Sequence, residues 1–103
     1  MYTHSKIHVG GTIMIRYSIL VDGRVQGVGF RFFTQLTASN LKLTGLCKIL
    51  YDGKVEIEVQ GPEKTLNNFI SLVKKGNNFS RVDEIVVNEI PTIENEKKYF
   101  IKY

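Results

Sequence analysis

The segment that decides the fold covers residues 21–31 and reads Val21-Asp22-Gly23-Arg24-Val25-Gln26-Gly27-Val28-Gly29-Phe30-Arg31. Three of the seven residues from Gly23 to Gly29 are glycines. That is too many for the interior of a helix or a strand, so this part is predicted to be a loop. The segment is therefore the point at which one regular element gives way to the next.

The residues on either side of the loop have opposite periodicities. Before it, apolar side chains recur at every second position, which predicts a half-buried strand over residues 15–22. After it, residues 30–41 are predicted to form a helix with Phe33, Leu36 and Thr37 on one side. The order is thus a strand, a glycine-rich loop and the start of a helix.

The remaining elements follow from similar patterns. Asp52-Gly53 predicts a tight hairpin turn, because both central positions of a type I′ turn need positive φ. Further strands are expected over residues 43–51, 55–60, 81–90 and 99–103. A second helix is expected between Gly61-Pro62 and Gly76, with Leu66, Phe69, Ile70 and Val73 facing the core.

This element order predicts an α+β fold. The order is β-α-β-β-α-β with a short extra C-terminal strand, which is typical of a ferredoxin-like α/β sandwich. Such a fold has a mostly antiparallel sheet with two helices on one face. The fold hosts many functions, so it does not by itself indicate one.

Composition narrows the class of protein further. The 103 residues suffice for one domain, and the net charge of +4 suits an anionic partner such as a phosphorylated small molecule or RNA. The single cysteine, Cys47, excludes an internal disulfide and a metal site made of cysteines alone. Neither a membrane-spanning run nor a secretion signal is evident, so a cytoplasmic monomer is expected.

The first 13 residues differ from the rest of the chain. Residues 1–13 are polar and have no clean period, and they are expected to be an N-terminal extension that is disordered or not native. The domain is then expected to cover residues 14–103. His4 and His8 have a metal-compatible spacing on a helix, but a frayed terminus is the preferred interpretation.

The glycine-rich loop has the features of an anion site. Glycines allow successive backbone N–H groups to turn inward around one point, and the following helix directs its positive dipole end there. Arg31, in the first turn, adds a planar guanidinium that suits bidentate binding of phosphate. On these grounds alone, a simple tight turn with a surface arginine stays open as an alternative.

The loop resembles the signature of the acylphosphatase family. That signature is V-x-G-x-V-Q-G-V-x-F-R, and residues 21–31 match every fixed position. The resemblance continues through Gly45, Asp52-Gly53, Gly61-Pro62 and residues 81–83 to the closing segment 99–103. It covers about residues 15–103.

The resemblance implies an activity and the residues that carry it. The family hydrolyses the carboxyl–phosphate bond of acyl phosphates, without a metal, another cofactor or a covalent intermediate. Arg31 is implied as the catalytic arginine. Phosphate is implied to bind to the backbone amides of Arg24, Val25, Gln26, Gly27, Val28, Gly29 and Phe30.

One departure from the family pattern concerns catalysis. The second family motif here reads Gly45-Leu46-Cys47-Lys48-Ile49-Leu50-Tyr51-Asp52-Gly53. By the resemblance, Ile49 occupies the position of an asparagine that orients the attacking water. Isoleucine has no hydrogen-bonding group, so weakened hydrolysis is expected. Lys48, Gln26 and Thr34 are candidates to replace the asparagine, and Cys47 is expected to be packed and inert.

Two further functions are weighed against the weakened hydrolase. One is a catalytically inactive module that binds a phosphate ligand at the same loop. The other is an RNA-binding domain, but such modules stack bases on aromatic residues of the third strand and residues 55–60 have none. Small-molecule acyl phosphates or phosphate are therefore the expected ligands, with no nucleic acid, membrane or metal partner.

Overall fold

The computed structural model describes residues 6–27 and 29–103. Their elements are β1 (Ile7–Val9), β2 (Thr12–Arg24), α1 (Phe30–Asn40), β3 (Thr44–Ile49), β4 (Val55–Pro62), α2 (Glu63–Lys75), β5 (Arg81–Ile90) and β6 (Tyr99–Ile101). From β2 onward this is the element order that the sequence predicts. The α+β, ferredoxin-like prediction is confirmed.

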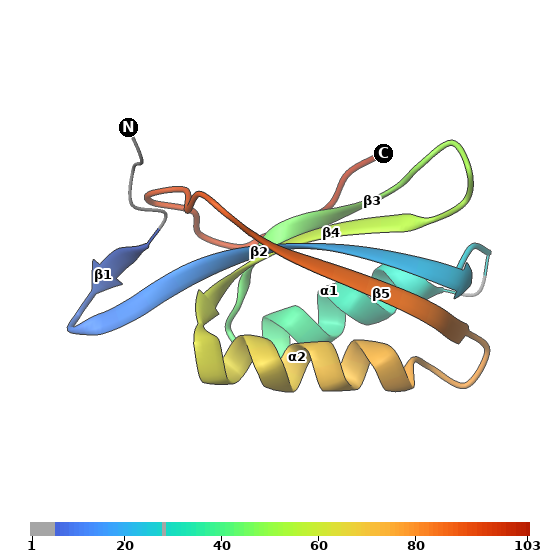
Figure 1. Cartoon of the computed structure of the whole chain (residues 1–103), viewed down its shortest axis with the longest axis horizontal. Helices are drawn as coiled ribbons and strands as arrows, with labels where there is room; N and C mark the ends of the chain where they lie inside the picture. The colour runs from blue at the N-terminus through green and yellow to red at the C-terminus, as the bar shows by residue number, and fades with distance from the viewer. Residues whose placement is uncertain (1–5, 28) are drawn as a thin grey trace.

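The sheet is built around the long strand β2 (Figure 1). β2 pairs antiparallel with β4 along one edge and with β5 along the other, and β4 pairs antiparallel with β3. β6 adds to β3 as the one parallel neighbour in the described sheet. This pairing brings the last residues of the described chain beside the strand that carries Ile49.

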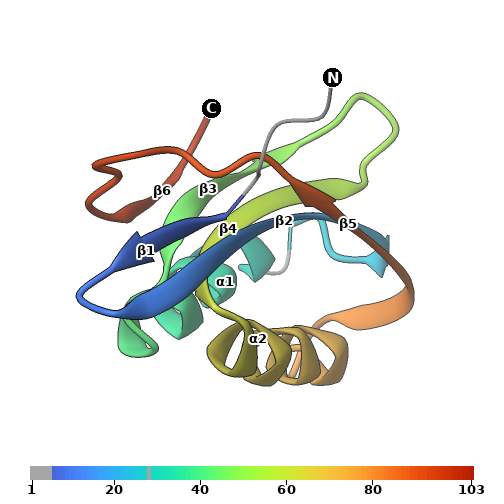
Figure 2. The ribbon, with the colours of Figure 1, turned by 60° about the vertical axis from the view of Figure 1, so that its left-hand side comes forward.

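Both helices cover the same face of the sheet, and the core lies between them and the strands (Figure 2). The buried side chains alternate along the strands, as in Ile15, Ile19 and Val21 of β2. On α2 the predicted face is found, with Leu66, Phe69 and Val73 fully buried and Ile70 packed beside them. Gly76 ends this helix, and its N–H donates to the Leu72 carbonyl.

The buried face of α1 differs from the prediction. Its buried residues are Phe30, Thr34 and Ala38, and Phe33 packs against them, whereas Leu36 is 51% exposed. Of the three residues that the sequence places on one side of this helix, Leu36 is therefore the one that faces solvent. Thr34, which was not among them, faces inward, and its hydroxyl lies 3.0 Å from that of Tyr99.

An arginine secures the opposite face of the sheet. Arg16 of β2 is fully buried, and its guanidinium pairs with Glu58 at 2.9 Å and with Glu96 at 2.8 Å. Gln60 accepts from the Ile93 N–H and donates to the Ile93 carbonyl, both at 2.9 Å. These contacts hold the segment between β5 and β6 against this face of the sheet. They therefore orient the chain where it enters β6.

The N-terminal part contains a strand that the sequence did not predict. β1 pairs antiparallel with the beginning of β2, with His8 opposite Ile13, and Gly10 and Gly11 make the turn. His8 is thus on a strand, where the helical metal spacing does not apply, and His4 lies outside the described residues. Among the described residues, no helix has the length and apolar character to cross a membrane.

Candidate active site

The glycine-rich loop follows β2, which stays paired with β5 as far as Arg24. The register between these strands shifts between Asp22 and Gly23, and a side chain at Gly23 would collide with the Arg81 carbonyl. The Val25 side chain is buried, and the Val25 N–H donates to the Gly23 carbonyl at 3.0 Å. Val25 thus holds the first half of the loop against the core, and it also lines the pocket described below.

The second half of the loop is open to solvent. Gly27 and Gly29 are exposed and both have φ of 72°, a left-handed conformation that favours glycine. Apart from the chain neighbours of each glycine, no atom of the described residues lies within 4 Å of the position a side chain would take at either one. Gly29 is also the N-cap of α1, and its carbonyl accepts from the Phe33 N–H at 2.9 Å. Val28, between them, lies outside the described residues.

A pocket of ≈ 150 Å³ lies at this end of α1. It is lined by Val25, Gly27, Gly29, Phe30, Arg31, Phe32, Ile101 and Tyr103. The guanidinium carbon of Arg31 lies 5.2 Å from the centroid of the Tyr103 ring, within the range of a cation–π contact. The lining thus combines two glycines and a cation with apolar side chains.

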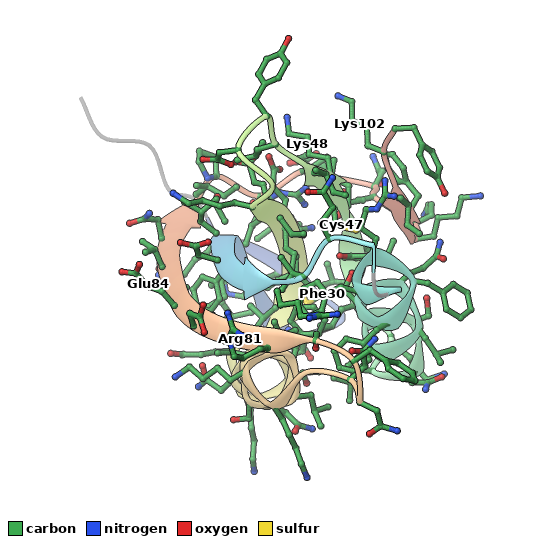
Figure 3. The ribbon with its side chains drawn as sticks, turned by 90° about the vertical axis from the view of Figure 1, so that its right-hand side faces the viewer. Phe30, Cys47, Lys48, Arg81, Glu84 and Lys102 are labelled. Carbon is green, nitrogen blue, oxygen red and sulfur yellow. The ribbon has the colours of Figure 1, made fainter. Side chains whose placement is uncertain are left out.

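A buried polar cluster supports the first turn of α1 from below. Thr34 donates to the Arg31 carbonyl at 2.9 Å, and its hydroxyl lies 3.0 Å from that of Tyr99. Burial raises the pKa of Tyr99 well above its ordinary value. The Cys47 thiol also faces the Arg31 carbonyl, at 3.8 Å. Figure 3 shows Cys47 and Phe30 in the interior beside α1, whereas Lys102 lies at the outer surface.

The end of β3 approaches the same site. Cys47 is fully buried and Ile49 packs against the core, so the two share a face, whereas Lys48 points to the other face and pairs with Glu56 at 3.5 Å. Four residues beyond Ile49, a side chain on Gly53 would come 3.0 Å from the Gln26 amide oxygen. Cys47, two residues before Ile49, thus contacts the Arg31 backbone, and the hairpin after Ile49 lies near Gln26 of the loop.

Known proteins share sequence with this chain over the loop, the helix and the strand that form the site. The sequence profile of acylphosphatases matches residues 17–101. The chain belongs to the acylphosphatase family. An acylphosphatase of Clostridium beijerinckii is 59% identical over 90 residues, which are 87% of this chain and 100% of that protein. The prediction of the family, and with it of an acylphosphatase-class enzyme, is confirmed.

Solved acylphosphatase structures agree in fold. The crystal structure from Bacillus subtilis superposes with a TM-score of 0.82 at 47% identity and covers 86% of this chain and 99% of that one. The structure from Coxiella burnetii gives a TM-score of 0.80 at 27% identity, with 86% and 93% covered. The family resemblance therefore extends from the loop motif to the whole domain.

The pocket at the start of α1 contains some of the predicted residues and others that were missed. Arg31, Gly27, Gly29 and Phe30 line it together, as expected for one site. Phe32, Ile101 and Tyr103 were not predicted, because the pairing of β6 with β3 that brings the last two there is not visible in local sequence. Among residues 6–27 and 29–103, no three acidic, histidine or cysteine side chains gather as metal ligands.

Proposed function

We propose that this chain is an acylphosphatase that hydrolyses acyl phosphates to a carboxylate and inorganic phosphate, and that Ile49 slows the reaction. The observation that carries the proposal is the pocket in which Arg31 meets the open, left-handed glycines of the loop. It is supported by membership of the acylphosphatase family over residues 17–101. The site would work on a small acyl phosphate, in a monomer located in the cytoplasm.

Arg31 and the loop would hold the phosphoryl group. The Arg31 side chain is partly exposed and lines the pocket, so its N–H groups can reach a phosphate there. Amides near Gly27 and Gly29 and the positive end of the α1 dipole would share the charge. Because Tyr103 lies against the guanidinium and Thr34 holds the Arg31 carbonyl, the arginine would be positioned before the substrate arrives.

The reaction needs little from the protein beyond this positioning. Water adds to phosphorus, the bond from phosphorus to the acyl oxygen breaks, and its electron pair leaves with the carboxylate. An acyl phosphate dianion and water thus become a carboxylate and dihydrogen phosphate, with atoms and charge balanced. Since a carboxylate is a good leaving group, the main contribution is electrostatic stabilisation of the phosphoryl oxygens.

Orientation of the water is the weak point of the site. By the family resemblance, Ile49 stands in place of the water-orienting asparagine, and it has no polar group. Thr34 is fully buried with its hydroxyl bonded, and Lys48 is on the far face, so neither is available as a substitute. Gln26 is exposed and lies near the hairpin after Ile49, so it is the candidate that fits best.

The test is continuous release of phosphate from benzoyl phosphate. The wild-type protein should release phosphate faster than Arg31→Ala, while Lys97→Ala, which removes the same charge at an exposed site near the other end of α1, should behave like wild type. Equal rates in the wild type and Arg31→Ala would contradict the hydrolase. Arg31-dependent binding of phosphate without turnover would instead favour the alternative, an inactive phosphate-binding module on the same site.

A further inference from the structure

A second pocket lies between the end of α1 and the start of α2, which are adjacent in Figure 1. Its volume is ≈ 470 Å³, against ≈ 150 Å³ for the pocket that contains Arg31. The side chains that line it are mainly polar, and they come from Asn40, Leu41, Lys42, Lys64, Thr65 and Asn68. We call this pocket the helix-end pocket.

The helix-end pocket is separate from the proposed phosphate site. Arg31 is in the first turn of α1, and Asn40 is the last residue of that helix. A rise of about 1.5 Å per residue puts these two positions roughly 14 Å apart along the helix axis. The two pockets share no lining residue among those described. A small ligand therefore occupies one of them without touching the other.

Two lysines give the helix-end pocket a positive charge. Lys42 and Lys64 are both exposed, and neither forms an ion pair among the described residues. No carboxylate is among the described lining residues, and Glu63, the residue before Lys64, is outside that lining. Lys48 and Lys54, by contrast, are each paired with a carboxylate. The charge of the two pocket lysines is therefore available to an anionic ligand.

The backbone at Lys42 is unusual for a lysine. Its φ is 60°, in the left-handed region that favours glycine. The end of α1 requires this conformation, because the Lys42 N–H donates to the Ser39 carbonyl and the Leu43 N–H donates to the Ala38 carbonyl. Residues other than glycine are uncommon in this conformation, and they are concentrated at functional sites. A lysine at this place therefore indicates a use for its charge.

The lining suits an anion with more than one phosphoryl group. Lys42 precedes β3 and Lys64 belongs to α2, so a ligand with two anionic groups can pair with both ammonium groups at once. The side-chain amides of Asn40 and Asn68 and the hydroxyl of Thr65 can donate hydrogen bonds to phosphoryl oxygens. No aromatic side chain is among the described lining residues, so a nucleotide base has nothing there on which to stack.

We propose that the helix-end pocket is a second anion site, which binds a small diphosphate, either free pyrophosphate or the diphosphate group of an organic compound. Lys42 and Lys64 bind the two phosphoryl groups, and the polar side chains between them orient the ligand. The site is independent of the proposed hydrolysis, because it contains none of the residues that would hold the acyl phosphate.

The test is calorimetric titration of Arg31→Ala, in which the phosphate site at the other end of α1 is disabled. Pyrophosphate and methyl diphosphate represent the two sources of the ligand, and inorganic phosphate provides a single phosphoryl group. At least one diphosphate is expected to bind about tenfold more tightly than phosphate, and the tighter of the two identifies the source. Equal affinities for all three compounds, or no binding of any of them, would overturn the proposal.

In the same background, Lys42→Gln/Lys64→Gln should weaken binding of the diphosphate by roughly tenfold or more. Lys74→Gln/Lys75→Gln is the matched control, because it removes the same charge from two exposed lysines in the last turn of α2. Similar weakening by the two double substitutions would indicate a diffuse attraction and would overturn the site.

NMR titration of the wild type with pyrophosphate locates the binding without any substitution. The amide signals of Asn40 and Thr65 should shift together, and their midpoint concentration should differ from that of any shift at Gly27 in the glycine-rich loop. Signals of Asn40 and Thr65 that do not move would overturn the second site, whatever happens at Gly27. A shift at Gly27 alone would leave the proposed phosphate site standing.

Discussion

Thr34 donates its hydroxyl hydrogen to the carbonyl oxygen of Arg31 over 2.9 Å. Because that hydrogen is used, the Tyr99 hydroxyl, 3.0 Å away, is the donor in its bond with Thr34. The two bonds form a chain from β6 through the core to the backbone of the residue proposed to hold phosphate. The position of Arg31 therefore depends on the strand that closes the sheet.

Breaking this chain at Thr34 should cost stability. Thr34→Val preserves the shape of the side chain but removes the buried hydrogen bonds of Thr34 with Tyr99 and with the Arg31 carbonyl, so the free energy of unfolding should fall by ~1–3 kcal/mol. The measurement is urea denaturation. Thr34→Val/Tyr99→Phe removes both hydroxyls and should recover most of the loss; a double variant as unstable as the sum of the two single variants would contradict the coupling.

Tyr99 should also make stability depend on alkaline pH. Burial raises the pKa of Tyr99 above the ordinary value of 10.0, so the folded state keeps a proton that the unfolded state releases. Its contribution is complete below about pH 10 and is lost as the pH rises further, by up to ~1.4 kcal/mol per pH unit. Denaturation measured between pH 8 and 11 should show that the free energy of unfolding declines more steeply with pH for the wild type than for Tyr99→Phe. Equal slopes for the two proteins would contradict this role of Tyr99.

Removing the charge of Glu96, a partner of the buried Arg16, should destabilise the fold. Glu96→Gln removes one of the two negative charges that pair with Arg16, and the expected loss of stability is ~1–3 kcal/mol. Asp83→Asn breaks an exposed pair with Arg81 and should cost less than ~1 kcal/mol. Thermal unfolding measures the loss of stability in the two variants. Equal losses would contradict the expectation that the buried pair of Arg16 stabilises the fold more than the exposed pair of Arg81.

Phosphate binding should depend on Arg31 and not merely on net charge. Loss of hydrogen bonds from a charged group costs ~1.5–3 kcal/mol, so Arg31→Ala should weaken phosphate binding by roughly tenfold or more. Lys97→Ala removes one positive charge as well and should keep the wild-type affinity. Titration calorimetry with inorganic phosphate at fixed ionic strength measures both, and similar weakening in the two variants would indicate a diffuse electrostatic effect.

Local sequence patterns were sufficient to predict much of the fold. The strong helical period of α2 is visible in a short window of sequence, and the helix occurs where expected. A turn also forms at Asp52-Gly53, but Gly53 has positive φ and Asp52 does not, so the prediction of a type I′ turn is wrong. The inward orientation of Thr34 was not visible, because its partner Tyr99 is 65 residues away. β1 was missed because it has three residues, two of them exposed, and depends on pairing with β2.

The candidate site was likewise predictable from the sequence only in part. The glycine loop and Arg31 are contiguous, so their chemistry could be predicted from one segment. Ile101 and Tyr103 reach the pocket through the parallel pairing of β6 with β3, and the pair of Arg16 with Glu96 holds the segment that precedes β6. These contacts join residues that are far apart in the chain and have no common local pattern.

The most direct test of the account is the kcat for benzoyl phosphate in Ile49→Asn. If Arg31 and the loop already hold the phosphoryl group and only orientation of the water is missing, the variant should raise kcat by up to ~10²-fold with little change in phosphate affinity. Ile49→Asn/Arg31→Ala should lose that gain. A correctly folded Ile49→Asn whose kcat equals that of the wild type would contradict the account.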